Sequence, residues 1–343
     1  MRLFLFIFSI IPLAFLSSQE TETSTLFDML YSQKNLSFTL TYPFDSLYKS
    51  NNNEIDATVS VNTANGYLIK EAPISLTLRG KFRRMKCVMP PLLLNFKKST
   101  LKDLGLLPID ELKLVTHCTQ DAVGENNLAE ERLIYQIYES LTPFSYRTIW
   151  VNIQYCNLSN PGECISTVAF LLEPDKVISN RLGITERKLF NISEDSIHFN
   201  SYAYTTAYNF LIGNRDWSIV SSRNAKLFYE KQSGKYVVIP YDFDYANIVG
   251  ATYRREALEK PMTHPYDRIY FGEYFMDKAG HILKTFYGLE KSIIDAVHAA
   301  SNPVDKERRQ SICEYFDYWF SMVKTMKPEK LQYGVVCRYR GGL

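Results

Sequence analysis

The first half of the chain carries short runs in which apolar or β-branched residues alternate with polar ones. Alternation over about four to eight residues indicates a β-strand with one buried face. The predicted strands are residues 36–41, 74–79, 92–96, 112–117, 147–156 and 165–173. The last two are joined through Asn160-Pro161-Gly162, a turn sequence that predicts a hairpin.

A helical period replaces this alternation between residues 126 and 141, and Pro143 ends the predicted helix. Further helices are expected at 200–213, 279–300 and 306–326, and short strands at 225–230 and 236–240. The pattern therefore predicts an α+β protein with two lobes, a β-rich N-terminal lobe holding one helix and a mainly helical C-terminal lobe. This is the element order of a protein kinase, although other α+β folds share it.

The N-terminus has the pattern of a secretory signal peptide. Arg2 precedes an apolar run over 3–16, and small Ser17 and Ser18 follow it. The run is shorter than the roughly 20 residues of a membrane helix, which disfavours the alternative of an N-terminal anchor. We therefore expect a signal peptide at 1–18, a secreted or otherwise extracytoplasmic (periplasmic) protein, and no membrane span after cleavage.

Composition adds limits on domain number and partners. The remaining residues, 19–343, contain no linker-like tract or repeat, so one domain is expected, with its N-lobe at about 25–173 and its C-lobe at about 174–343. The formal net charge is only +2, which argues against a nucleic-acid partner.

Six cysteines in an exported chain favour disulfides over buried free thiols. Proximity along the chain predicts Cys156–Cys164 across the hairpin turn and Cys313–Cys337 near the C-terminus. Elimination then leaves Cys87–Cys118, between two strand regions.

The segment from residue 211 to residue 244 carries the most informative polar residues. Asp216 and Asn224 follow the predicted helix, and Asp242 and Asp244 follow the strand at 236–240. Phosphoryl transfer uses one carboxylate to orient the attacking hydroxyl, and an Asn and a second carboxylate to hold Mg²⁺. Asp216 precedes Asn224 by eight residues, whereas the kinase spacing is about five. The alternative is that these residues only cap turns.

Several stretches resemble the spore-coat protein H (CotH) kinase family. They are GNRDW at 213–217, RNAKLF at 223–228, IPYDFD at 239–244, LRGKFRRMKCVMPPLLLNF at 78–96 and DLGLLPIDELKLVTHC at 103–118. The similarity covers residues 74–275. The resemblance implies a kinase-like fold, and some members phosphorylate coat proteins with ATP and a divalent metal.

Carried over by position, the resemblance makes Asp216 the catalytic carboxylate and Asn224 and Asp242 metal ligands, with Asp244 a second acidic candidate. A kinase also needs a lysine for the phosphates and a helix glutamate to hold that lysine.

Lys113 is the first choice for this lysine, with Lys81 and Arg79 behind it. The motif comparison points to Glu131 as its partner and the helical period to Glu130. No G-x-G-x-x-G is present, so Arg or Lys side chains are expected to hold the phosphates.

These observations predict an exported kinase that uses ATP with Mg²⁺ or Mn²⁺ and phosphorylates a hydroxyl of a protein or a surface polymer. The alternative is an inert kinase-fold protein used for binding or envelope assembly. The histidines show no zinc or triad pattern, and no G-x-S-x-G is present.

Overall fold

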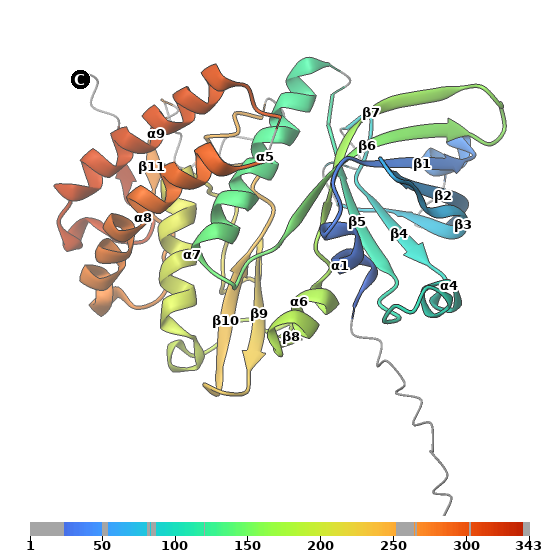
Figure 1. Ribbon diagram of the computed structural model, residues 1–343. Coiled ribbons are helices and arrows are strands. Elements are labelled where there is room, and N and C mark those ends of the chain that lie inside the picture. Colours follow the sequence, from blue (N-terminus) through green and yellow to red (C-terminus); the bar gives the residue numbers. More distant parts are fainter. Residues whose placement is uncertain are drawn as a thin grey trace, which may run out of the picture.

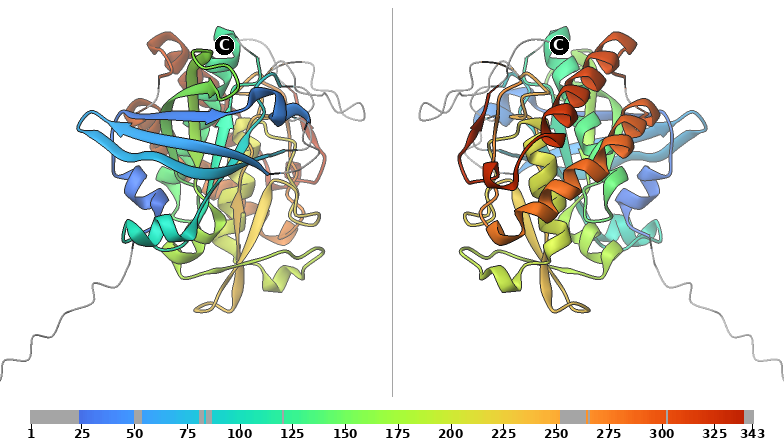
Figure 2. Two further views of the ribbon diagram at one scale, coloured as in Figure 1. Left: turned by 90° about the vertical axis from the view of Figure 1, so that its right-hand side faces the viewer. Right: turned by 90° about the vertical axis from the view of Figure 1, so that its left-hand side faces the viewer.

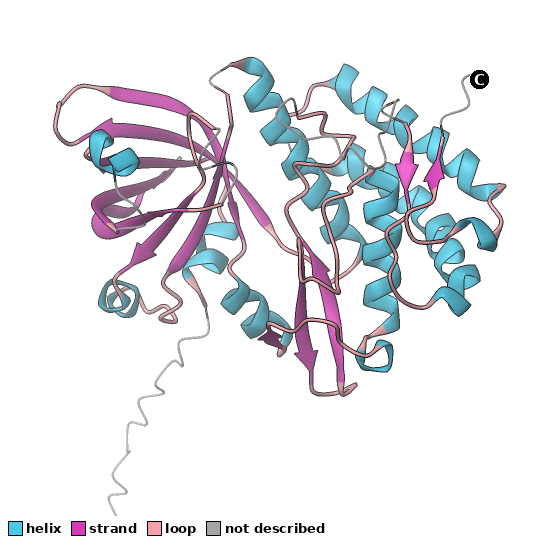
Figure 3. Ribbon diagram, turned by 180° about the vertical axis from the view of Figure 1, so that it is seen from behind, coloured by secondary structure: helices cyan, strands magenta, loops and turns pink. Residues whose placement is uncertain are grey.

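The structure is a computed structural model that describes residues 24–49, 54–80, 83, 87–119, 121–251, 264, 266–301 and 303–338. The predicted signal peptide at 1–18 and the second-choice lysine, Lys81, lie outside the described residues. The chain has mixed α and β structure, as the sequence pattern predicts. Strands of the N-terminal half gather in one body, and most long helices lie in the other (Figures 1 and 3).

Seven strands of the N-terminal half form a closed barrel in the order β1-β2-β3-β4-β5-β7-β6. They are β1 (Leu36–Tyr42), β2 (Ile55–Thr63), β3 (Gly66–Leu78), β4 (Leu92–Phe96), β5 (Glu111–Thr116), β6 (Thr148–Asn157) and β7 (Cys164–Leu172). The sequence did not predict the barrel, because its closure depends on parallel pairing between β1 and β6, which are far apart in the chain. It also missed β2 and residues 66–73 of β3.

Strict alternation makes β1 fit this barrel. Leu36, Phe38, Leu40 and Tyr42 are buried, and the residues between them are partly exposed. A strand with this period presents one face to a core and the other to solvent. Three short helices flank the barrel strands, α1 (Leu26–Tyr31), α2 (Phe44–Lys49) and α4 (Lys98–Asp103).

Helix α5 (Ala122–Leu141) connects β5 to β6. It begins four residues before the predicted start, because the Asp121 side chain caps it by accepting a hydrogen bond from Gly124 N–H at 2.8 Å. Helix α5 packs against the C-terminal half of the chain, mainly through its buried apolar side chains such as Leu133 and Ile137.

The C-terminal half contains the remaining helices and short strands. In chain order they are α6 (Asp175–Leu182), β8 (Thr185–Arg187), η1 (Glu194–Ser196), α7 (Phe199–Ile212), β9 (Ala225–Glu230), β10 (Lys235–Pro240), β11 (Arg268–Ile269), η2 (Met276–Lys278), α8 (Ala279–Ala299), α9 (Lys306–Lys324), η3 (Pro328–Lys330) and β12 (Val336–Cys337). Helices α8 and α9 lie side by side and pack on α7, as the right-hand view of Figure 2 shows. In the described part of the chain no helix is both long and apolar enough to span a membrane.

Strand β7 joins two separate hydrophobic cores. Ala169 and Leu171 point into the barrel core, whereas Phe170 and Leu172 belong to the core built around α5, α7, α8 and α9. Both faces of the strand are therefore buried at its end, which explains the continuous apolar run of the sequence there. The segment that follows, beginning with Glu173, leaves the barrel between the two cores.

Two of the three predicted disulfides are confirmed. Cys87–Cys118 and Cys156–Cys164 each have Cα atoms 4.2 Å apart. The third, Cys313–Cys337, was wrong, because neither cysteine forms a disulfide. Cys313 faces the core from α9, with its sulfur 3.7 Å from His298 Nε2, whereas Cys337 lies in β12 and pairs with Arg268 of β11.

Candidate active site

The loop after α7 holds Asp216 through hydrogen bonds to its own backbone. Helix α7 ends at Gly213 in the left-handed region, at φ 68°, and a Cβ there would lie 2.8 Å from Asn247. Buried Asn214 follows, and its Oδ1 accepts a hydrogen bond from Asp216 N–H at 3.0 Å. Its Nδ2 donates to Asn209 on α7 at 2.9 Å. The helix end therefore fixes the position of Asp216.

Asn224 lies beside Asp216 although eight residues separate them. The two backbone hydrogen bonds between Ser218 and Arg223, at 2.8 and 2.9 Å, close the intervening residues into a loop. Asn224 Nδ2 then donates to the Asp216 carbonyl at 2.6 Å and to its Oδ2 at 3.0 Å. Because the amide nitrogen makes these bonds, the amide oxygen is the atom that can face a cation. Asn224 therefore lies beside Asp216 despite the longer loop, as the shorter kinase spacing would place it.

Asp242 is connected to the same loop through the end of β10. Tyr241 N–H donates to the Asn224 carbonyl at 3.0 Å, and Asp242 N–H donates to the Tyr135 hydroxyl on α5 at 2.6 Å. Asp242 has φ 61° and Asn224 φ 48°, a region in which residues other than glycine are strained. The structure thus places Asn224 beside Asp216 and joins the Asn224 backbone to the end of β10, which carries Asp242.

The carboxylates of this region repel one another. Burial raises the pKa of Asp242 well above its usual value, and the nearby Asp244 and Glu131 raise it further. Burial raises the pKa of Glu131 to about 7, with Asp244 adding to the rise and Arg83 opposing it. The pKa of Asp216 is also raised, by burial and by Asp244. Negative charge concentrated in a buried site is stabilised by a bound cation.

A second set of charged side chains surrounds Asp175, the first residue of α6. Lys113 Nζ lies 2.7 Å and Lys226 Nζ 2.5 Å from Asp175 Oδ2, and the Tyr146 hydroxyl donates to Oδ1 at 2.6 Å. Burial lowers the pKa of Lys113 to about 8. Arg79 is partly buried and interacts electrostatically with Asp242 and Asp175. Arg79 therefore interacts with an acid of each set.

The expected pairing of Lys113 with a glutamate of α5 is wrong. Lys113 on β5 pairs with Leu172 of β7, so its side chain reaches the start of α6 and binds Asp175 there. Glu131 instead binds Arg83 at 3.4 Å, and Glu130 binds Arg308 on α9 at 2.6 Å.

Sequence reasoning missed Asp175 and Lys226. It also missed Tyr135, which binds the Asp242 backbone, and Tyr146, which binds Asp175. Lys226 lies in the stretch RNAKLF, so its position between Asn224 and the strand was available as a signal. Asp175 had no such signal, because only the path of the chain after β7 brings it to Lys113.

Two hollows of the surface border the predicted site residues or the lysines beside them, and a third, larger one does not. A cavity of about 80 Å³ is bordered by Arg79, Arg83, Glu131, Tyr135 and Asp242 together with Gly80, Pro91, Val115, Leu172 and Tyr241. A hollow of about 410 Å³ borders the same Tyr241 and includes Lys226.

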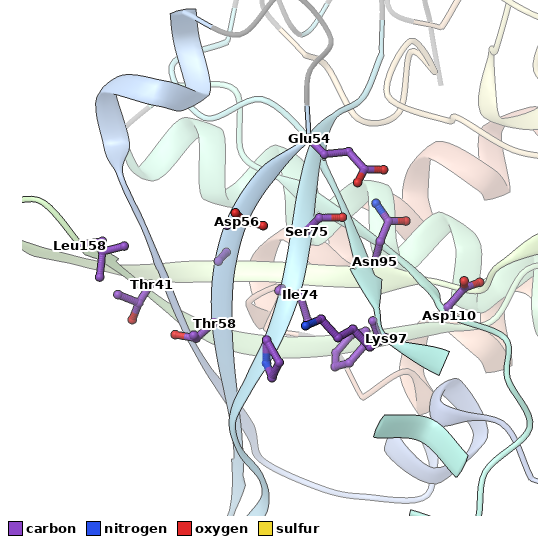
Figure 4. Close-up of a pocket in the computed structure, with 13 residues that line it drawn as sticks. Thr41, Glu54, Asp56, Thr58, Ile74, Ser75, Asn95, Lys97, Asp110 and Leu158 are labelled. Carbon is purple, nitrogen blue, oxygen red and sulfur yellow. The ribbon is translucent and has the colours of Figure 1, made fainter. Parts of the chain in front are cut away.

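A wider hollow, about 720 Å³, lies on the outer face of strands β2–β4, where Asp56, Ser75 and Asn95 stand in a row (Figure 4). None of the residues predicted for catalysis or for cofactor binding lines it. Its size therefore says nothing about the acidic site.

In the part of the chain that the structure describes, no three His, Cys, Asp or Glu side chains are placed to hold a metal ion by themselves. The available set at the acidic site is two carboxylates, Asp242 and Asp244, and the amide of Asn224. Mg²⁺ keeps several waters and takes substrate phosphate oxygens as ligands, so a site with few protein ligands suits it.

Comparisons with known proteins give little support for any family. No family model matches the chain, and no curated protein matches it. Among solved structures, it is similar to a Helicobacter pylori proinflammatory kinase, CtkA, with 10% sequence identity over 82% of this chain and 94% of that chain and a TM-score of 0.32. A likeness at this level does not establish a shared fold, so the resemblance to the CotH family remains a prediction from the sequence motifs.

Proposed function

We propose that this protein is an atypical kinase with a two-lobed, kinase-like fold that uses ATP with Mg²⁺ or Mn²⁺. The observation that carries the proposal is that the Asp216–Asn224 pair is bonded to the end of β10, where buried Asp242 lies close to other carboxylates that raise its pKa. Strongly perturbed pKa values of buried groups that face a cavity are typical of functional sites.

Each acidic residue takes a distinct role in this proposal. Asp242 and the Asn224 amide oxygen bind the cation that bridges the phosphates, and buried Asp244 adds negative charge beside them. Asp216 lies at the open side of the group, with its side chain 37% exposed. It therefore orients the acceptor hydroxyl.

The phosphates are held by side chains instead of a glycine-rich backbone. Arg79 begins the connection between β3 and β4, Lys113 lies on the next strand and Lys226 approaches from β9. In protein kinases a loop covers the phosphates and a strand lysine contacts them. In this proposal Arg79 takes the place of the loop, and Lys113 on β5 takes the place of the strand lysine. A bound nucleotide would replace Asp175 as the partner of at least one lysine.

The acceptor is a hydroxyl of a protein or of a surface polymer outside the cytoplasm. Two disulfides favour an oxidising compartment, in agreement with the predicted signal peptide. A shallow exposed position for Asp216 suits a large acceptor that approaches from solvent.

A second candidate function is an inert kinase-fold module used for binding or envelope assembly. Three observations favour it: both lysines already bind Asp175, Glu131 binds Arg83, and the cavity at the acids is only about 80 Å³. Ligand pockets are usually several hundred Å³.

Calorimetric titration with ATP and Mn²⁺, together with transfer of labelled phosphate to envelope fractions, separates the two candidates. We expect the wild-type protein to bind Mn²⁺–ATP and Asp242→Asn to lose binding by about 100-fold, since a charged metal contact is removed. Asp216→Asn should bind normally and transfer no phosphate, because its contact matters in the transition state. Asp56→Asn, on the outer face of the barrel, is the matched control. Wild-type protein that binds no nucleotide with either metal would favour the inert module.

A further inference from the structure

A second groove, distinct from the acidic site, lies along another stripe of α5. It has a volume of about 610 Å³ and is bordered by the end of α1 with the residues after it, by α5 and by the start of β6. Arg132, Gln136 and Glu139 contribute from α5, at the spacing of one helical face. Glu131 and Tyr135 lie on the neighbouring stripe and face the acidic site. One helix therefore separates two sites.

Arg132 is a buried cation in this groove, and none of the described carboxylates forms an ion pair with it. It is 5% exposed, its Nη1 donates to the Ser301 carbonyl at 2.7 Å, and its Nε has no hydrogen-bond partner among the described residues. Burial lowers its pKa to about 10. The nearest acid on the helix, Glu139, accepts a hydrogen bond from the Tyr31 hydroxyl at 2.5 Å instead. A buried guanidinium with an unused N–H suits a bound anion, because it binds carboxylates through parallel N–H bonds.

Aromatic and amide side chains surround this arginine. The Trp150 ring lies 5.8 Å from the Arg132 guanidinium and is only partly buried, and Tyr31 lies at the other border. Gln136 and exposed Asn152 carry amides that can donate to and accept from hydroxyl groups. Flat aromatic faces beside amides fit a ring that has apolar C–H faces and hydroxyl edges.

We propose that this groove binds a saccharide that carries a carboxylate. In this arrangement the carboxylate accepts hydrogen bonds from Arg132, the sugar hydroxyls contact Gln136 and Asn152, and the sugar ring lies on Trp150. An acidic peptide fits less well, because β6 pairs with β1 on one side and β7 on the other and offers no free strand edge.

Tryptophan fluorescence tests the proposal with digalacturonate as the probe. The chain has three tryptophans, and Trp217 and Trp319 are 2% and 0% exposed. A change in emission on titration should therefore come from Trp150 and disappear in Trp150→Phe. The methyl ester of the same disaccharide removes the negative charges and keeps the rings. It should bind at least about tenfold more weakly, as should Arg132→Gln with the acid.

Asn152→Ala keeps the test valid if Arg132→Gln does not fold, because residue 152 is exposed in β6. It should weaken binding of the acid several-fold. Asn95→Ala, the same change on the outer face of the barrel (Figure 4), should leave binding unchanged. Equal binding of the acid and its ester, equal quenching by inorganic phosphate, or no binding by the wild-type protein would each overturn the proposal.

Discussion

Two groups of buried charges lie near the junction of the barrel and the helical half, and they are built in opposite ways. The Glu173 cluster consists of Glu173, Arg147, Arg181 and Asp28. Fully buried Glu173 accepts hydrogen bonds from both arginines at 2.8–3.0 Å, and Arg147 also binds Asp28 at 2.6 Å. Its two carboxylates are matched by two guanidinium groups.

The Asp242 cluster consists of Asp242, Asp244, Glu131 and Asp216. Asp244 raises the pKa of Asp242, Glu131 and Asp216, and Glu131 also raises that of Asp242. Glu131 forms an ion pair with Arg83 at 3.4 Å, and Asp216 forms one with Arg223 at 3.3 Å. The contrast shows that burial alone does not explain the acids. The Glu173 cluster holds the chain after β7 in place, whereas mutually repelling carboxylates are what the proposed cation site requires.

A substitution in the Glu173 cluster should have the largest effect on the unfolding free energy. Glu173→Gln removes the fully buried charge that Arg147 and Arg181 share and leaves Arg181 without a carboxylate, which costs about 3 kcal/mol of unfolding free energy. Urea denaturation followed by circular dichroism measures this change. Glu163→Gln, at an exposed position of the β6–β7 turn, is the control and should shift the unfolding free energy by less than about 0.5 kcal/mol. Equal losses of unfolding free energy in the two variants would mean that the Glu173 cluster does not stabilise the fold more than an exposed glutamate does.

The two disulfides should differ in their effect on the Asp242 cluster. Cys87–Cys118 ties the β3–β4 connection, which carries Arg79 and Arg83, to the residues just before α5. Replacing both of its cysteines by serine should lower the unfolding free energy by about 3 kcal/mol and also weaken binding of Mn²⁺–ATP.

The matched pair of substitutions removes Cys156–Cys164 at the far end of the β6–β7 hairpin. It should lower stability by about 2–3 kcal/mol and leave nucleotide affinity unchanged. Calorimetry on both double variants measures the difference, and equal nucleotide affinities would separate the β3–β4 connection from the site.

Removing a negative charge from the Asp242 cluster should raise the unfolding free energy instead of lowering it. Asp242→Asn removes one repelling charge while keeping the shape of the side chain, so the metal-free protein should gain about 1 kcal/mol. The same variant should lose the stabilisation that Mn²⁺ gives to the wild type. Thermal melting with EDTA and with Mn²⁺ measures both effects. A loss of stability in EDTA would show that Asp242 has a structural role instead.

The pH dependence of melting should show the smallest effect. The pKa of Glu131 is raised from 4.5 to about 7 in the folded protein, so folding binds a proton between these values. This group therefore destabilises the metal-free protein above about pH 7, and stability from it increases as the pH falls toward about 5. The shift of melting temperature caused by Mn²⁺ should be smaller at pH 6 than at pH 8, because protons compete with the metal. In Glu131→Gln the Mn²⁺-induced shift should differ less between pH 6 and pH 8. In the control Glu111→Gln it should differ as much as in the wild type.

The sequence predicted the local features well and the long-range ones poorly. Alternation found β1 and the hairpin of β6 and β7, and the motif order placed Asp216, Asn224 and Asp242 in one region. Parallel pairing of β1 with β6 and the contact of Lys113 with Asp175 join residues distant in the chain, which periodicity does not report.

The Cys313–Cys337 prediction failed for the same reason. Proximity along the chain suggested a bridge, but the helical period of α9 turns Cys313 into the core. Position in the sequence says little about direction in space unless the elements between two residues are short.

The most direct test of the account is a crystal structure grown with Mn²⁺ and a non-hydrolysable ATP analogue, with data collected at the manganese absorption edge. We predict an anomalous peak at about 2.2 Å from an Asp242 carboxylate oxygen, with the Asn224 amide oxygen and phosphate oxygens as further ligands. The terminal phosphate should point toward Asp216. Clear density for the analogue with no manganese peak at Asp242, or a peak elsewhere on the protein, would contradict the assignment of the Asp242 cluster as the cation site.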